Sequence, residues 1–502
     1  MTNSFISDAH QFENLRSLTL RVSGGDAPPL EIWDLTQLES LTFGDDVEGN
    51  VLGSVEGLGK LTGLQRLEFR NVQLVTPISS SDIDTLTSLH TLVVLGPLFG
   101  TYFPEKSVFG LQSLRVLELT GVDCVPKALE TLQLEKLHFW FPGFSTNVFQ
   151  RTSFLPTGLD KLVTLQELRF TECMVSNALL HHIGHLASLR VFEMECVTLN
   201  GTWNIQGNMP SGLEKISLYG CAMDDYPDMS SFTALRSLEL QSNSVARLYD
   251  YDAMANGTDD VIVGLDKLCS LEELSYGYSD HDQDLVYHVH KIPFAICHLP
   301  RLRTLELSLQ CKRMPLDLTR LVSLEQLTLN TESRLLHSCE EIGALTNLSS
   351  LHFIDTSLAA LPDLSHLTKL TELWLHDWKL KRLPDWVGCL SNLCHLHVET
   401  SQDPVHLPES LGNLTNLRRF TLRCCSATIL RLPQSLTNLS SLECLVIKAR
   451  STVLPDGIGN LTALTRLSTH CKSPTSLAES ERQKLTNLRH LYLGGENACL
   501  FE

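Results

Sequence analysis

The sequence lacks the features of a membrane protein and of a nucleic-acid-binding protein. No uninterrupted apolar run approaches the roughly 18 residues that a membrane helix needs, and the first residues show no basic segment followed by an apolar one. Lysine and arginine number 39 against 58 aspartates and glutamates, which gives a formal net charge of −19. Because nucleic acids are bound by clustered basic residues, we expect no nucleic-acid partner. Because the sequence shows neither a membrane helix nor a signal segment, we expect no membrane partner and a cytoplasmic location.

Motifs for catalysis, metals and cofactors are also missing. There is no H-E-x-x-H sequence and no kinase signature. The stretch G-L-G-K-L at 57–61 lacks the spacing of a phosphate-binding loop and corresponds to an ordinary G-L-D-K-L at 264–268. We therefore expect no enzymatic activity, no bound nucleotide and no other cofactor.

The cysteines do not form a recognisable framework. They number 15, an odd count, and they contain no C-x-x-C pair. This spacing predicts neither a set of disulfides nor a zinc site. Four of them follow predicted strands at equivalent points and are expected to be small buried thiols: Cys173, Cys196, Cys221 and Cys425.

An acidic segment in the middle of the chain imitates a calcium loop incompletely. Asp280, Asp282 and Asp284 have the spacing of its first ligands. Leu285 and Lys291 stand where such a loop needs a glycine and a bidentate glutamate. We favour a solvated acidic loop over a calcium site, and we predict no metal site.

What the sequence has in abundance is one repeated phrase. The pattern L-x-x-L-x-L, with other large apolar residues as substitutes, recurs in twenty units between residues 15 and 488. The mean spacing is about 25 residues, inside the roughly 20 to 29 of leucine-rich repeats. The alternating x-L-x-L-x part of each unit predicts a short strand with leucines on one face. The L-P step that follows in many units predicts a short helical turn, because proline disfavours helix before it and tolerates the first helical position.

These units predict a leucine-rich-repeat solenoid of the α/β class. No unit can bury its own leucines, so neighbouring units must stack, with a parallel sheet on the concave side and short helical or irregular segments on the convex side of a horseshoe. We expect a single domain over residues 1–502 with about twenty repeats. Lengthened repeats are expected near 140–158, 244–263 and 277–294. The first contains K-L-H-F-W-F-P-G-F at 136–144, interpreted as an aromatic cluster sealing a junction, with a binding loop as the alternative.

The repeats in the last third of the chain resemble a known family. Residues 383–396, 407–420, 432–445 and 454–467 read LPDWVGCLSNLCHL, LPESLGNLTNLRRF, LPQSLTNLSSLECL and LPDGIGNLTALTRL. They are similar to the leucine-rich-repeat region of plant intracellular nucleotide-binding disease-resistance proteins. The resemblance implies a sensing or regulatory module of plant innate immunity and signal transduction. The asparagine that many leucine-rich repeats carry after the strand is nearly absent, with Asn243 a rare match.

One group of variable strand positions has the composition of a binding surface. Tryptophan, histidine and arginine gather on three successive predicted strands, and such residues dominate protein interfaces because they bury large area with little entropy loss. The alternative is that they only pack against neighbouring columns, and His352, His395 and His397 leave a metal site as a further alternative. The predicted ligand-binding residues are Glu372, Trp374, His376, His395, His397, Glu399, Arg419 and Arg423.

The predicted function is non-enzymatic recognition of a protein ligand on the concave face. Two alternatives stay open: a constitutive intracellular scaffold for signalling proteins, and the ectodomain of a leucine-rich-repeat surface receptor. Six N-x-S/T sequons favour the second, although four of them belong to the repeated N-L-S/T phrase. Little sequence is left to cap the two ends of the solenoid, so we also expect association through the ends.

Overall fold

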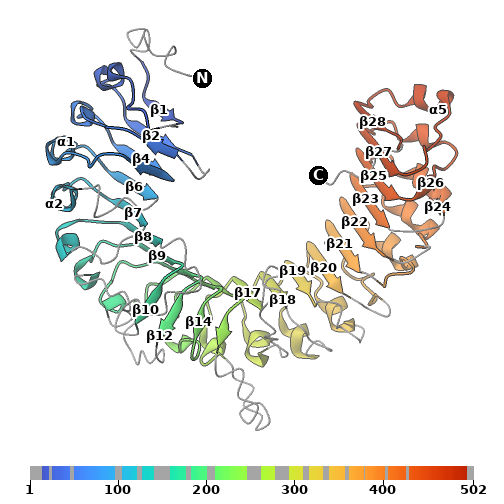
Figure 1. Ribbon diagram of the computed structural model, residues 1–502. Coiled ribbons are helices and arrows are strands. Elements are labelled where there is room, and N and C mark those ends of the chain that lie inside the picture. The colour runs from blue at the N-terminus through green and yellow to red at the C-terminus, as the bar shows by residue number, and fades with distance from the viewer. Residues whose placement is uncertain are drawn as a thin grey trace. The chain divides into compact units, whose positions relative to one another are not determined.

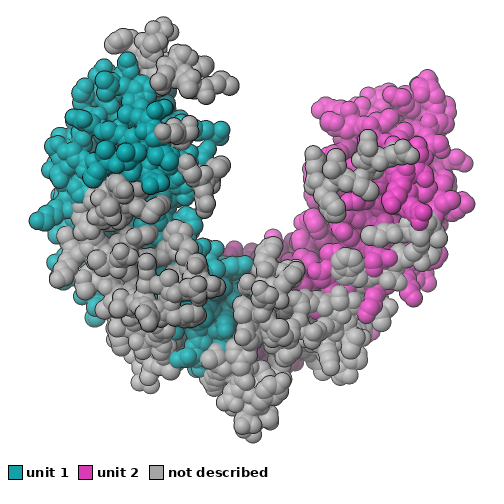
Figure 2. Space-filling model, in the orientation of Figure 1, with its two compact units in different colours: residues 1–268 teal, residues 269–502 magenta. Residues whose placement is uncertain are grey.

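A computed structural model describes most of the chain, and these residues form two compact units. The units comprise Met1–Leu268 and Cys269–Glu502 (Figure 2). The described residues are 14–21, 25–45, 50–95, 104–120, 127–140, 159–176, 182–200, 210–245, 262–277, 293–308, 316–331, 339–356, 361–377, 379–401, 405–424 and 429–494.

The first unit contains a ladder of short parallel strands, one from each repeat (Figure 1). Each strand pairs in parallel with the strand of the next repeat, so the strands follow one another in chain order. The strands are β1 (Ser17–Leu20), β2 (Ser40–Gly44), β4 (Arg66–Arg70), β6 (Thr91–Leu95), β7 (Val116–Thr120), β8 (Lys136–Trp140), β9 (Glu167–Thr171), β11 (Val191–Glu195), β13 (Lys215–Tyr219) and β15 (Ser237–Gln241).

The second unit repeats this arrangement. Its strands are β17 (Glu273–Gly277), β18 (Thr304–Ser308), β19 (Gln326–Asn330), β20 (Ser350–Thr356), β21 (Glu372–Asp377), β22 (His395–Thr400), β23 (Arg419–Cys424), β25 (Cys444–Ala449), β27 (Arg466–Cys471) and β28 (His490–Tyr492). The parallel ladders confirm the predicted leucine-rich-repeat solenoid.

Leucine columns hold the repeats of each unit together. The second residue of each strand aligns with its counterpart in the next repeat, as Leu117 does with Leu137 and Leu373 with Leu396. All four side chains are at most 2% exposed. Full burial of each leucine contributes about 1.5–3 kcal/mol, and only stacking provides it. Leu18, in the first strand, is only half-buried, although the sequence predicts it to point inward like the others.

After most of the described strands the chain returns through a short helical segment, mostly a single 3-10 turn. In three of the L-P repeats the proline immediately precedes the turn and its carbonyl accepts the first bond, as from the amide of Val387 to Pro384 at 3.2 Å, whereas after Pro455 the turn begins only at Ile458. The prediction of a turn is confirmed, with proline as its N-cap. No helix in the described residues is long and apolar enough to cross a membrane.

The return segments of unit 1 are η2 (Leu30–Asp34), η3 (Leu58–Lys60), α1 (Ser80–Asp84), α2 (Glu105–Val108), η4 (Lys127–Thr131), η5 (Leu159–Lys161), η6 (Met229–Ser231) and η8 (Leu265–Lys267). Those of unit 2 are η9 (Phe294–His298), η10 (Leu316–Arg320), η11 (Glu340–Ala344), η12 (Asp385–Cys389), η13 (Glu409–Asn413), η14 (Gln434–Asn438), η15 (Ile458–Asn460) and α5 (Glu479–Lys484).

Smaller sheets follow the main strands at some repeats. In unit 1 a residue with positive φ often ends the main strand, as at Asn71, Glu172 and Gly220, and turns the chain into a second short strand. The short strands pair in parallel as β3 (Asn50–Leu52) with β5 (Val72–Leu74), β10 (Met174–Ser176) with β12 (Thr198–Asn200), β12 with β14 (Ala222–Met223) and β14 with β16 (Ser244–Val245) in unit 1, and as β24 (Ile429–Arg431) with β26 (Ser451–Val453) in unit 2.

Asparagines bridge repeats at two different places. Asn243 is buried, donates to the carbonyl of Leu218 at 2.7 Å and accepts from the amide of Cys221 at 2.9 Å. A second set lies just before the strands of unit 2 and comes from the repeated N-L phrase. Asn392, for example, donates to the carbonyl of Thr368, one repeat earlier, at 2.8 Å. Amide bridging between repeats is therefore more extensive than the sequence pattern predicts.

Several sequence predictions fall wholly or partly outside the described residues. These include the acidic segment with its calcium-like spacing, Cys425, and most of the lengthened repeats near 140–158, 244–263 and 277–294. The single domain over 1–502 stays a prediction. The aromatic stretch at 136–144 is partly a regular strand, because Lys136–Trp140 forms β8, with Phe139 buried and stacked on Phe170 at 5.7 Å.

The described cysteines are free thiols. Cys173 and Cys221 are buried as predicted, and burial raises the pKa of Cys221 to about 12, so this thiol stays protonated at neutral pH. Cys196 is exposed, which contradicts the prediction, because it has a φ of 52° and turns the chain between two strands.

Candidate functional site

The register of the sheet places all eight predicted site residues on three neighbouring strands of unit 2. The residues between them, such as Leu373 and Leu396, are at most 2% exposed, so the alternate residues face away from the core. We call this outward side of the main strands the strand face. Across β21, β22 and β23 the predicted residues form rows: Glu372, His395 and Arg419; Trp374 and His397; His376, Glu399 and Arg423.

Trp374 is the centre of the site. Its ring lies between two histidines of the adjacent strands, 5.2 Å from His352 and 4.6 Å from His397 between ring centroids. The ring pair with His397 is stacked, with an interplanar angle of 18°. The indole Nε1 donates to Glu372 Oε1 at 2.7 Å, yet the residue remains 40% exposed. The indole is therefore both accessible and held in place.

The two flanking histidines contact the indole as neutral rings. Burial lowers the pKa of His352, against the opposing charge of Glu372. Burial is also the main cause that lowers the pKa of His397, with the hydrogen bond to Glu399 opposing it and the charge of Arg423 adding to it. Both values lie below the ordinary 6.5, so both imidazoles are predominantly uncharged at pH 7.

The remaining predicted residues are only partly brought together. Glu399 accepts from Arg423 at 3.5 Å and lies 3.4 Å from Nε2 of His397. His376 pairs instead with Asp355 of β20, at 3.4 Å between Nδ1 and Oδ1. The side chains of His395 and Arg419 form no hydrogen bond or ion pair with other described residues. The structure thus joins Trp374 to His352, His397 and Glu372, whereas His395 and Arg419 have no such partner among the described residues.

The metal alternative finds no support in this geometry. Among the described residues, no group of three or more His, Cys, Asp or Glu is arranged to hold a metal ion. Nε2 of His352 lies 3.1 Å from the hydroxyl of Ser350 and 3.8 Å from Glu372. The side chains of His352 and His397 therefore interact with neighbours on their own or the adjacent strand and with the indole.

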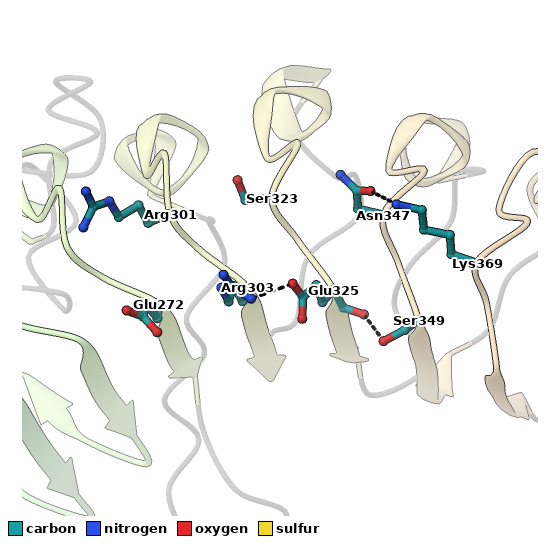
Figure 3. A pocket seen from close by; sticks show the side chains of 8 residues that line it. All are labelled: Glu272, Arg301, Arg303, Ser323, Glu325, Asn347, Ser349 and Lys369. Atoms are coloured by element: carbon teal, nitrogen blue, oxygen red, sulfur yellow. Dashed lines mark hydrogen bonds and ion pairs between the residues drawn. The ribbon is translucent and has the colours of Figure 1, made fainter.

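A polar groove that the sequence did not indicate runs along the edge where the strands of unit 2 begin (Figure 3). Its volume is about 740 Å³. Most of its polar groups bridge adjacent repeats, as Arg303 does to Glu325 at 2.9 Å and Lys369 to Asn347 at 2.7 Å. Its lining comprises Glu272, Arg301, Arg303, Ser323, Glu325, Asn347, Ser349 and Lys369.

A second groove of about 490 Å³ continues along the same edge, past Asn392 and Asn416, whose side-chain amides donate to carbonyls of the preceding repeat. The position just before each strand recurs in every unit and holds mostly polar residues, and this pattern could have indicated both grooves. We interpret them as polar seams between repeats, since most of their groups interact with one another.

Comparisons with known proteins agree with this architecture. The profile of the leucine-rich repeat region family matches residues 399–498. The disease resistance-like protein DSC1 of Arabidopsis thaliana is 29% identical over 189 residues, which is 31% of this chain and 15% of that protein. The chain thus spans less than a sixth of this relative's length. Its repeats resemble those of plant resistance proteins, as the sequence predicted.

Solved structures show similar repeats at low identity. A leucine-rich-repeat protein of Leptospira interrogans is 21% identical, with 97% of this chain and 98% of that chain covered and a TM-score of 0.45. The plant peptide hormone receptor RGFR1, solved in complex with RGF2, is 18% identical, with 96% and 80% covered and a TM-score of 0.45. The Toll–Spatzle complex of Drosophila contains a chain that is 16% identical, with 95% and 56% covered and a TM-score of 0.49.

Proposed function

We propose that this chain is a non-enzymatic recognition module whose strand face on β20 to β23 binds a protein ligand. One observation carries the proposal: Trp374 is exposed and immobilised between His352 and His397, with its indole nitrogen bound to Glu372. Large aromatic side chains that need no further ordering are the usual anchors of protein interfaces. The repeat architecture, whose stacked units present extended surfaces to partners, agrees with a protein-interaction role.

The proposed biological context is plant-type innate immunity, as a ligand sensor or as a regulator of a signalling partner. The support is the similarity of the repeats to DSC1, described as disease resistance-like. The geometry of the aromatic site supports the binding role only, because neutral histidines and a single indole offer shape and stacking in place of chemical reactivity. The ligand is expected to pack an apolar or aromatic side chain against the exposed edge of the Trp374 ring.

Substitution of the tryptophan tests the proposal. Proximity labelling in plant cells with the wild-type chain would provide candidate partners, and each would then be titrated as a purified protein. Trp374→Ala should weaken the binding of a true ligand by at least about 2 kcal/mol, which is roughly a thirtyfold increase in the dissociation constant, as for an interface hot spot. The melting temperature should change little, because the residue is 40% exposed.

A matched control exists in unit 1. Trp140 is also on the strand face, at the end of β8, and Trp140→Ala should leave the affinity unchanged. Equal affinities for the wild type and Trp374→Ala would remove this surface from consideration. An equal loss in both variants would show that the effect does not depend on the Trp374 site.

A further inference from the structure

The strand face next to the Trp374 site carries cations on three consecutive strands. Arg419 and Arg423 lie on β23, Lys448 on β25 and Arg466 on β27. The parallel register places Arg419 and Arg466 in one row, with Cys444 between them, and Arg423 and Lys448 in a second row. All four side chains are exposed. We call these four residues the cationic strip. The strands that bear it succeed one another in unit 2 (Figure 1).

No carboxylate stands among them on the same face. The other outward positions of these three strands hold Thr421, Cys444, Val446, Ser468 and His470. None of these residues can neutralise an arginine or a lysine, so a net positive charge accumulates over the three strands.

Two of the four cations lack a partner. Arg423 reaches Glu399 of the preceding strand at 3.5 Å, at the margin of the strip. The side chains of Arg419 and Arg466 form no ion pair or hydrogen bond with any residue that the structure describes. Both lie beside Cys444 in the register, which places two unpaired guanidinium groups two strands apart. Two guanidinium groups at this distance can each bind one carboxylate of a single extended segment.

The ionisation of His470 reflects the same charge. Burial lowers its pKa, and the charges of Lys448, Arg466 and Arg423 lower it further. The imidazole also contacts Tyr492 of β28, with 4.9 Å between the ring centroids. Lys448, Arg466 and Arg423 therefore place His470 in a region of positive potential that disfavours another cation.

We propose that the cationic strip binds a short acidic segment of the same protein ligand that contacts Trp374. The proposal rests on the proposed function, because it names the chemistry of the partner at an adjoining part of the same face. Strands lie about 4.8 Å apart, so the three strands span about 10 Å, or roughly three residues of an extended peptide. The segment therefore carries two or three carboxylates and adjoins an apolar anchor for the indole.

A nucleic acid fits this surface less well. The whole chain has a formal charge of −19, and Asp355, Glu372 and Glu399 lie on the strands immediately before the strip. A polyanion with one charge every few ångströms would extend beyond the strip and meet these carboxylates. A short acidic segment can place all its charges on the four cations.

Fluorescence anisotropy with defined probes tests the proposal on the full chain at low salt. The probe is a short fluorescein-labelled peptide that alternates glutamate with serine behind one tryptophan. A peptide with glutamine in place of glutamate and a short oligothymidylate are the comparison probes. The variant Arg419→Gln/Arg466→Gln should bind the acidic peptide at least about tenfold more weakly than the wild type. Arg169→Gln, which removes a paired arginine from the strand face of unit 1, should bind it as the wild type does.

Carbodiimide coupling locates the peptide independently. It joins a carboxylate to a nearby amine, so the acidic peptide should be attached to Lys448, and Lys448→Arg should abolish this product while preserving the affinity. The proposal is overturned if the wild type does not bind the acidic peptide, or if the double variant binds it equally well. It is also overturned if oligothymidylate binds at least as tightly through the same two arginines.

The two proposals can fail separately. A natural partner that depends on Trp374 but not on Arg419 and Arg466 would retain the recognition function and reject the acidic segment. Binding of the acidic peptide through the two arginines, with every natural partner indifferent to Trp374→Ala, would do the reverse.

Discussion

On the strand face of unit 1, Arg169 lies 2.7 Å from Glu167 and 2.9 Å from Glu193. The same carboxylates bind Lys136 at 2.8 Å and Lys215 at 2.7 Å. Cations and anions thus alternate across β8, β9, β11 and β13, and Lys136, Arg169 and Lys215 each meet a carboxylate of a neighbouring repeat. On the strand face of unit 2, the corresponding positions of β23, β25 and β27 hold cations without a carboxylate among them.

The difference separates charges that serve the fold from charges that are available to a ligand. A compensated network satisfies its own hydrogen bonds and gains nothing from a partner, whereas an uncompensated cation such as Arg419 or Arg466 lowers its free energy by meeting an anion. Both units share the same leucine columns, so the difference lies in the variable positions alone. It follows that the two faces can be tested against each other in one chain.

The largest expected effect concerns what the two units share. Leu168→Ala in unit 1 and Leu396→Ala in unit 2 should each destabilise the surrounding repeats by about 3 kcal/mol, because both side chains are at most 2% exposed in equivalent columns. Hydrogen exchange resolved by peptide would measure the free energy of opening in each unit. A loss confined to one of the two variants would show that the cores are not equivalent.

The next effect concerns the compensated charges themselves. Glu68 is 3% exposed and is bound by both Arg66 and Arg70. Glu68→Gln should destabilise unit 1 by about 2 kcal/mol, since it removes two charge-assisted hydrogen bonds. Arg419→Gln should change the stability of unit 2 by less than about 0.5 kcal/mol. Similar losses in urea unfolding of the two variants would break the distinction between structural and available charges.

An effect of similar size distinguishes the two kinds of asparagine bridge. Asn243 is buried and makes two hydrogen bonds, so Asn243→Ala should cost about 2 kcal/mol. Asn392 is exposed and makes one bond to the carbonyl of Thr368, so Asn392→Ala should cost about 0.5 kcal/mol. Thermal unfolding of both variants would rank them, and the reverse order would refute the assignment.

The smallest effect is a dependence on acid. Burial alone would raise the pKa of Glu167, but the hydrogen bond from Lys136 and the charges of Arg169 and Lys136 outweigh it, and the pKa lies below 4.5. This carboxylate therefore stabilises the fold above its unfolded pKa, and the contribution is lost as the pH falls through the lowered value. Hydrogen exchange in β9 should accelerate between pH 4.5 and that value, and Glu167→Gln should remove this component. An unchanged profile in the variant would exclude Glu167 as its source.

Much of the candidate site could be predicted from the sequence, because the strand period determines which residues face outward. Trp374 and His397 were identified from their positions in successive repeats, and the register places them side by side. The pairing of His376 with Asp355 could not be predicted, because a β-bulge interrupts the register between β20 and β21 after Phe353. The sequence also could not predict that Arg466 has no partner among the residues that the structure describes, because this depends on which side chains of the neighbouring repeats reach it.

The sequence by itself determined the repeat, its strand, its turn and the burial of its leucines. All four features follow from the apolar pattern that recurs in every repeat, because its alternating apolar residues can be buried only if the units stack. The tertiary structure alone decided which outward charges meet. Arg169 and Arg419 both occupy outward strand positions. Only the neighbours one repeat away, about 24 to 31 residues distant in the chain, determine whether each is neutralised or left open.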